Sequence, residues 1–311
     1  MKPEQEKEKR RQRILTEPVG PLLIKTALPT MAGMLGLLAG MLGNIVLDPL
    51  FILVFKMGIR GAGIATLIGQ AGGCVLLCAL SFRHGNIPVG VSRCRLSGGR
   101  LGHILLGGAP NFSRQGITSL AGVLLNRAAA PFGDSVIASL TISSRVAALA
   151  YLIMIGFGQG FQPICAMNYG AKQYTRVRRA FRLAVRAGTV FLAAAAAVIA
   201  VFAEKASGLF TANLEVTEIT AAMLRLQCLS LPFLCFYALS GMYMQNIGEY
   251  KKAILISILR QGLVSLPLLL ILPALFGVFG ICLLQPAADI LSFLLSLLIM
   301  LPQLRKMREW G

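Results

Sequence analysis

The sequence predicts an all-α integral membrane protein with about eight transmembrane helices. Its 311 residues are 56% hydrophobic and 14% charged, and the mean hydropathy is +0.73, far from the balance of a soluble domain. The net charge of +18 lies in short clusters between the apolar runs. We interpret these clusters as membrane topology signals and expect no nucleic-acid partner, since the chain contains no basic-aromatic module.

The individual spans follow from the apolar runs, which are separated by links that carry most of the charged residues. In chain order, the runs cover about 29–54, 61–82, 104–126, 135–159, 183–204, 218–240, 253–274 and 278–302. Lys56 and Arg60 mark the link after the first run, Arg127 ends the third, and Lys205 ends the fifth. Each run is long enough to cross a hydrocarbon core of roughly 30 Å as a helix.

Positive charge predicts the orientation of the chain. Lys and Arg gather in every second link, at 2–13, 83–100, 172–186, 251–252 and 305–308, whereas the opposite links hold only Lys56, Arg60, Arg127 and Lys205. By the positive-inside rule, both termini are expected to be cytoplasmic. Residues 1–20 are too long and too acidic for the charged start of a secretory signal, so we interpret them as a basic cytoplasmic tail.

Motifs for enzymatic, metal and disulfide chemistry are absent from the sequence. It contains no P-loop, no Gly-x-Ser-x-Gly elbow, no His-Glu-x-x-His and no paired carboxylates on one helix. Most of the seven cysteines fall in apolar segments, where they act as small hydrophobes, and the only histidines are His84 and His103. We therefore expect no enzyme, no bound cofactor and no metal site.

A short internal match indicates a repeat. The stretch "GIRGAGIATLIGQ" at 58–70 aligns with "GVFGICLLQPAAD" at 277–289, at an offset of 219 residues. The match places Gly58 on Gly277, Gly61 on Gly280, and Gln70 on Asp289. Parallel repeats are a common way to build membrane transporters, so the match points to transport.

Ionisable residues inside the spans are the best functional leads, because a charge at the bilayer centre costs about 2.5–3.5 kcal/mol on insertion scales. They are Asp48, Arg114, Arg145, Glu218, Arg225 and Asp289, with Arg260 closer to a helix end. The Asp48–Pro49 pair predicts a kink at which the helix restarts, with the carboxylate capping the amide of Leu50 or Phe51; the alternative is a carboxylate that faces a cavity. Glu218 is expected to lie in the first turn of its helix, where the helix dipole favours an acid.

Three segments resemble a known family. They are "NIVLDPLFILVFKMGIRGAGIATLIGQ" (44–70), "GAPNFSRQGITSLAGVLLNRAAAPFGDSVIASLTISSRV" (108–146) and "GFGQGFQPICAMNYGAKQYTRVRRAF" (156–181). The last is the most specific, through the run from Gln162 to Ala171. Together they are similar to the multidrug and toxic compound extrusion (MATE) family of bacterial type. The resemblance implies two six-helix lobes around a cavity with alternating access, and efflux of organic cations or drugs, driven by protons or sodium ions across the bacterial inner membrane.

The same resemblance implies that most of the first four helices are lacking, with a join near 29–35. The expected organisation is a basic cytoplasmic tail (1–20), a two-span remnant of the first lobe (21–82), a cytoplasmic linker (83–103), a complete six-helix second lobe (104–303) and a cytoplasmic tail (304–311). The shortened lobe would impair transport, and small-residue faces left uncovered would favour self-association. Two alternatives stay open: a non-transporting membrane remnant, and a lipid-linked oligosaccharide flippase of the same superfamily.

Candidate site residues follow from the polar positions and the resemblance. Asp48 and Asp289 are the ion-coupling candidates, although Asp289 could instead be tied to a neighbouring arginine. The candidates for a cavity that binds small lipophilic or cationic substrates are Gln70, Arg114, Met154, Gln159, Gln162 and Gln285, with Tyr151 and Phe157 as aromatic neighbours. Arg114 and Arg145 could also snorkel or hold helices together, and Gln162 could satisfy backbone groups freed at Pro163.

Overall fold

The computed structural model describes residues 16, 18, 43–81 and 98–309, and these residues are almost entirely helical, with no strand among them. The chain divides into two compact units, Met1–Leu96 and Ser97–Gly311, which are described separately below. The predicted tail at 1–20 falls almost wholly outside the described residues, and the predicted join near 29–35 falls outside them altogether. The all-α membrane fold predicted from the sequence is confirmed.

The described part of the first unit is a pair of helices, Gly43–Val54 and α4 (Gly58–Ser81). The first continues through Asp48 and Pro49 and widens into a π-helix, η1 (Leu50–Val54), in which the amide of Phe55 donates to the Leu50 carbonyl at 3.0 Å. The predicted break and cap at Asp48 are therefore wrong. Pro49 has helical dihedral angles, and no side chain caps the π-helix. The backbone therefore stays helical through Pro49 and continues into the π turn.

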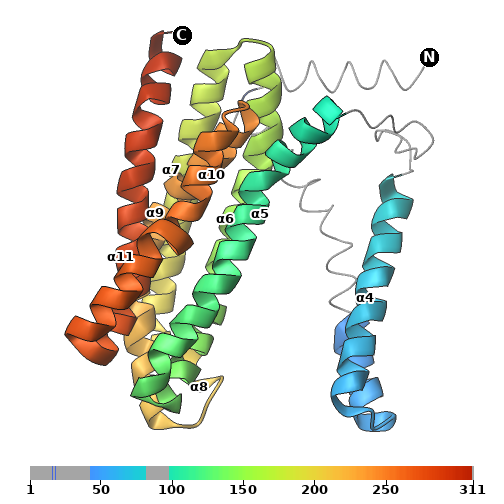
Figure 1. Cartoon of the computed structure of the whole chain (residues 1–311), viewed down its shortest axis with the longest axis vertical. Coiled ribbons are helices and arrows are strands. Elements are labelled where there is room, and N and C mark those ends of the chain that lie inside the picture. Colours follow the sequence, from blue (N-terminus) through green and yellow to red (C-terminus); the bar gives the residue numbers. More distant parts are fainter. Residues whose placement is uncertain (1–15, 17, 19–42, 82–97, 310–311) are drawn as a thin grey trace. The chain divides into compact units, whose positions relative to one another are not determined.

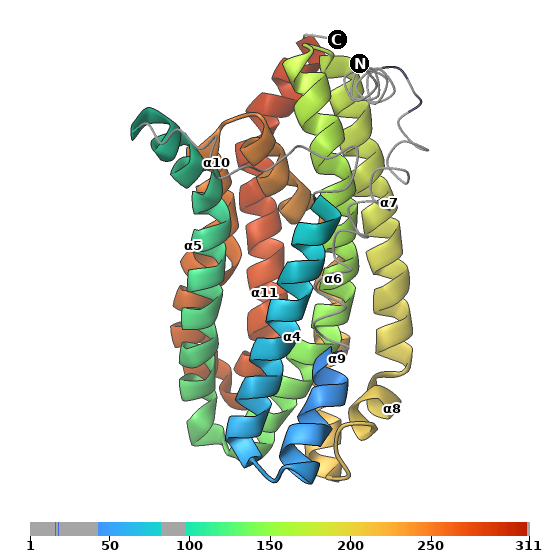
Figure 2. The same ribbon diagram turned by 90° about the vertical axis from the view of Figure 1, so that its right-hand side faces the viewer.

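The second unit is a bundle of long helices that run side by side (Figure 1). Its elements are α5 (Gly98–Ala129), η3 (Ala130–Phe132), α6 (Asp134–Gly170), α7 (Tyr174–Val201), α8 (Ala203–Gly208), α9 (Leu214–Asn246), α10 (Tyr250–Ile258), the π-helix η4 (Leu259–Val264) and α11 (Ser265–Glu309). The core of the unit lies along α9, which packs against α6, α7 and α11. The short α8 lies at the end of the bundle where α7 passes into α9 (Figure 2).

A bend at Gly277 divides α11 into two helices and lies between the last two predicted spans, the first of which also includes α10 and η4. Five described helical stretches are long and apolar enough to cross a membrane, and the last of them, Tyr250–Lys306, runs through this bend and so covers both spans. The helix α5 is not among the five, although it is 32 residues long. Its middle carries Asn111, Arg114 and Gln115, two of which line the cavity described below.

Several helices extend beyond the apolar runs that predict them. The start of α5 at Gly98 makes the last residues of the predicted linker helical, and α11 continues to Glu309 through most of the predicted C-terminal tail. The helix α9 begins at Leu214, where Asn213 accepts a hydrogen bond from the amide of Glu215 at 3.0 Å. The predicted first-turn role of Glu218 is therefore wrong. Hydropathy marks the part of a helix that lies in lipid, whereas the hydrogen-bonded backbone ends at its cap.

The glycines of the predicted repeat adopt equivalent conformations. Gly58 and Gly277 have positive φ angles of 54° and 56°, a region that glycine enters at little cost. Three residues later, Gly61 and Gly280 each face a backbone carbonyl of the preceding helix: a Cβ at Gly61 would lie 3.0 Å from the Phe51 oxygen, and one at Gly280 would overlap the oxygen of Leu272. These contacts confirm the 219-residue match at its glycine positions.

Candidate functional site

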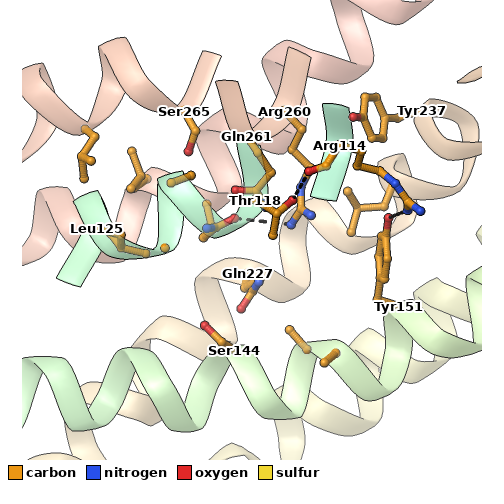
Figure 3. Close-up of a pocket in the computed structure, with 18 of the residues that line it drawn as sticks. Arg114, Thr118, Leu125, Ser144, Tyr151, Gln227, Tyr237, Arg260, Gln261 and Ser265 are labelled. Carbon is orange, nitrogen blue, oxygen red and sulfur yellow. Dashed lines mark hydrogen bonds between the residues drawn. The ribbon is translucent and has the colours of Figure 1, made fainter. Parts of the chain in front are cut away.

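A cavity of about 350 Å³ opens among α5, α6, α9, α10, η4 and α11 (Figure 3). Its apolar lining includes Leu125, Leu231, Leu234, Leu266, Leu269 and Leu284, and its polar lining includes Arg114, Gln115, Thr118, Ser144, Tyr151, Gln227, Tyr237, Ser257, Arg260, Gln261, Ser265 and Gln285. The volume lies within the range of about 300–1,000 Å³ typical of small-molecule sites. A mostly apolar wall with a few convergent polar groups suits a small amphiphilic ligand.

Arg114 projects from α5 toward α6 and is held there by two neutral partners. Its Nη1 donates to the Tyr151 hydroxyl at 3.1 Å (Figure 3), and its Nη2 lies 3.4 Å from Oδ1 of Asn111, one turn earlier on α5. The structure gives Arg114 no ion pair with any of the described residues. Its positive charge therefore reaches the cavity uncompensated by a carboxylate.

Arg260 is the second arginine of the cavity, and it is paired. Its Nε donates to Oδ1 of Asp289 on α11, and its Nη2 lies 3.4 Å from Oε1 of Gln285. The Oγ of Ser230 on α9 donates to the other carboxylate oxygen of Asp289 at 2.8 Å. The Arg260 guanidinium also lies 6.0 Å from the centre of the Tyr151 ring, within the range of a cation–π contact.

The π-helix η4 and the bend in α11 bring this pair together. Arg260 lies in η4, and π turns of this kind are rare and frequently found at functional sites. Asp289 is 29 residues later in sequence, on the far side of the bend at Gly277. The Asp289 side chain is 0% exposed and is not part of the cavity lining, so it lies behind Arg260 as its counter-charge. This geometry matches the arginine-tied carboxylate that the sequence leaves open as an alternative.

The remaining predicted cavity residues fall in different places. Arg114 and Gln285 line the cavity together with Tyr151. Met154 is buried in the bundle, with 2% of its surface exposed, while Gln159 and Gln162 are half-buried on α6; none of these three is in the lining. Arg145 is exposed on α6, and Arg225 forms an exposed ion pair with Glu204 at 2.8 Å. The structure gives the positions of these residues, and the functional roles predicted for them stay predictions.

Sequence reasoning did not single out Gln227, Tyr237 and Gln261, which also line the cavity. Tyr237 donates its hydroxyl to the Ser257 carbonyl at 3.2 Å and so fixes α9 against α10. The signal for Gln227 was available, since it is an uncharged polar residue in an apolar run. Its amide is nearly buried, with 8% exposed.

The first unit holds the other two candidates, Asp48 and Gln70. Gln70 is exposed on α4. Asp48 is half-buried, and its Oδ1 has no hydrogen-bond partner among the described residues; the same holds for Oδ1 of Asn44, one helical turn earlier. Buried oxygens without donors are costly, and the addition of a proton or a hard cation would relieve that cost. No group of three or more His, Cys, Asp or Glu side chains suited to a metal occurs within the described ranges.

Some known proteins resemble this chain in sequence, and some solved structures resemble it in fold. The Multidrug export protein MepA of Staphylococcus aureus (strain MSSA476) is 28% identical over 271 residues, which cover 86% of this chain and 59% of that protein. MepA of Staphylococcus haemolyticus (strain JCSC1435) is 26% identical over 249 residues, which cover 80% and 55% of the two chains. This chain therefore spans less than two thirds of the relatives' length.

A solved structure described as the outward-facing conformation of a multidrug resistance MATE family transporter of the MOP superfamily has the same fold. Its TM-score is 0.80 at 22% identity, over 89% of this chain and 63% of that one. The MatE family profile matches residues 112–271, from the middle of α5 through η4 into α11, and so includes Arg114, Tyr151 and Arg260. Since that match covers about half of the chain and includes most of the helices around the cavity, the chain belongs to the MatE family, the multidrug and toxic compound extrusion proteins.

Proposed function

We propose that this chain acts as a multidrug export antiporter, which moves small lipophilic or cationic molecules out of the cell in exchange for protons or sodium ions. Family membership and the similarity to MepA support export, and the cavity between α5, α6, α9 and α11 is the observation that carries the proposal. An ion gradient would supply the energy, with no nucleotide, bound cofactor or enzymatic step. Exchange would proceed by alternating access of the cavity to the two sides of the membrane.

Orientation in a bacterial inner membrane with both termini cytoplasmic is part of the proposal. The turn between α6 and α7, which carries Lys172, lies at the same end of the second unit as the end of α11, which carries Arg305 and Lys306 (Figure 1). The opposite end carries Arg127 and Lys205, on α5 and α8. The positive-inside rule supports placing the first end in the cytoplasm.

Asp48 is the ion-coupling residue that we propose to test first. Among the described residues, neither its Oδ1 nor that of Asn44 has a hydrogen-bond donor, which supports binding of a proton or of a sodium ion by these two oxygens. Asp289 is a weaker candidate, because Arg260 and Ser230 occupy both of its carboxylate oxygens.

Reconstituted vesicles test the proposal. The full chain is inserted into liposomes loaded with rhodamine 123 or fluorescein, a proton or sodium gradient is imposed, and the dye retained is measured after detergent lysis at a fixed pH. We expect dye to leave faster than from protein-free vesicles only while a gradient exists. The Asp48→Asn variant should abolish that dependence, whereas Glu218→Gln, at an exposed acid on α9, should leave it intact.

Release of both dyes at the same rate with and without each gradient would overturn the antiporter and leave the non-transporting remnant as the better account. Movement of a lipid-linked oligosaccharide from one leaflet of such vesicles to the other, with retention of both dyes, would favour the flippase. Chemical cross-linking in the same vesicles tests the proposed self-association of the chain, which predicts a dimer band that persists on dilution with lipid.

A further inference from the structure

The cavity of the second unit carries one unbalanced positive charge. Among the described residues that line it, Arg114 and Arg260 are the only charged side chains, and no carboxylate is among them. Asp289 neutralises Arg260 from behind the wall, with both carboxylate oxygens already bonded. Within the part of the chain that the structure describes, the side-chain partners of Arg114 are a phenol and an amide, and both are uncharged. The net charge facing a ligand is therefore +1.

The positive charge of Arg114 lies where its electrostatic interaction with a ligand is strong. Arg114 is half-buried on α5, and the cavity wall beside it is formed largely by leucine side chains. In a site with apolar walls, a charge is screened less than in water, so it attracts an anion and repels a cation by more than it would at an exposed surface. A lipophilic cation would have to enter against Arg114, with no carboxylate among the described lining residues to bind it.

We propose that this cavity selects small lipophilic organic anions, aromatic carboxylates or sulfonates, and that Arg114 is the residue that binds the anionic group. The guanidinium offers several donors in a planar fork that matches a carboxylate, and an incoming anion would replace the Tyr151 hydroxyl and the Asn111 amide as its acceptor. The Tyr151 and Tyr237 rings and the leucine wall would hold the aromatic part. As a statement about transport, this inference rests on the proposed export function. It restricts the proposed substrates to lipophilic anions and excludes cations.

Two dyes with the same xanthene core and opposite charge test the selection. The full chain is placed in nanodiscs of zwitterionic phosphatidylcholine, so that the lipid adds no net charge, and titrated against fluorescein, an anion, and rhodamine 123, a cation. Fluorescence anisotropy at fixed pH and moderate ionic strength gives both dissociation constants. We expect fluorescein to bind about tenfold more tightly than rhodamine 123.

Three variants test whether Arg114 causes the preference for fluorescein. Arg114→Gln should weaken fluorescein binding by about tenfold and leave rhodamine 123 binding unchanged or tighter. Arg114→Lys keeps the charge and should retain most of the affinity, whereas Arg145→Gln removes an exposed arginine from α6 outside the cavity and should change neither dye. Equal binding of the two dyes by the unmodified chain would overturn the inference, as would an equal loss of fluorescein affinity in the Arg145→Gln and Arg114→Gln variants.

These binding results are independent of the transport assay. Gradient-driven release of rhodamine 123 together with equal binding of the two dyes would leave the antiporter standing and the anion selection refuted. Arg114-dependent preference for fluorescein with no gradient-driven release of either dye would support the anion selection and refute the antiporter.

Discussion

Removing one partner of the buried pair between Arg260 and Asp289 should destabilise the second unit, and Asp289→Asn is the substitution that tests it. Asparagine keeps the shape and an oxygen acceptor for Ser230, but it leaves the Arg260 charge without its counter-charge. Breaking a buried pair by removal of one partner costs about 3–5 kcal/mol. We expect the lower end, about 3 kcal/mol, because the Arg260 side chain keeps 15% of its surface exposed at the cavity while Asp289 keeps none.

For a unit of this size, a loss of about 3 kcal/mol corresponds to a fall in melting temperature of about 6–12 °C. Differential scanning fluorimetry of the full chain in nanodiscs measures it. The matched control is Glu204→Gln, which breaks the exposed Arg225–Glu204 pair, with side chains 52% and 66% exposed, and should cost below about 1 kcal/mol. An Asp289→Asn variant that melts within 2 °C of the control, by the same conversion of about 2–4 °C per kcal/mol, would refute the reasoning.

Three further predictions use the same thermal measurement. Gly280→Ala should destabilise the second unit by at least about 1 kcal/mol, because its Cβ would overlap the Leu272 carbonyl oxygen; Gly116→Ala, which has open space at the Cβ position, should be neutral or slightly stabilising. Asn213→Ala should cost about 1 kcal/mol through loss of the cap at the start of α9, and an unchanged melting temperature would argue against that cap. Ser230→Ala should cost about 1.5–3 kcal/mol, since it removes a hydrogen bond to a buried carboxylate.

The five described helical stretches that are long and apolar enough to cross a membrane could be predicted from the sequence, because the bilayer fixes both their length and their hydropathy. The glycines of the repeat could be recognised for a different reason, since a positive φ at Gly58 and Gly277 and close backbone contact at Gly61 and Gly280 both favour the residue without a Cβ. In each case a single local requirement selects the residue type, so it is visible in one sequence.

The cavity could be predicted only in part, because its charges are paired through tertiary structure. Asp289 was recognised as costly in an apolar run, but its partner depends on how η4 and the bend at Gly277 align two helices. At Asp48 the failure is of a different kind, because there a local sequence rule gave the wrong prediction. Asp-Pro is typical of a helix start, but here Pro49 has helical dihedral angles and the helix continues into η1.

The two arginines of the cavity differ in what surrounds them, and that difference limits how tightly a ligand can bind. Asp289 cancels the charge of Arg260, so the cavity presents one unbalanced guanidinium instead of two. An exporter of the kind proposed above would have to release its cargo as well as bind it, and two free arginines in an apolar pocket would hold an anion more strongly than one. Removal of the counter-charge should therefore raise anion affinity: in a folded Asp289→Asn variant, fluorescein should bind more tightly and dissociate more slowly than from the unmodified chain. Weaker fluorescein binding in that variant would mean that Asp289 organises the cavity instead of balancing its charge.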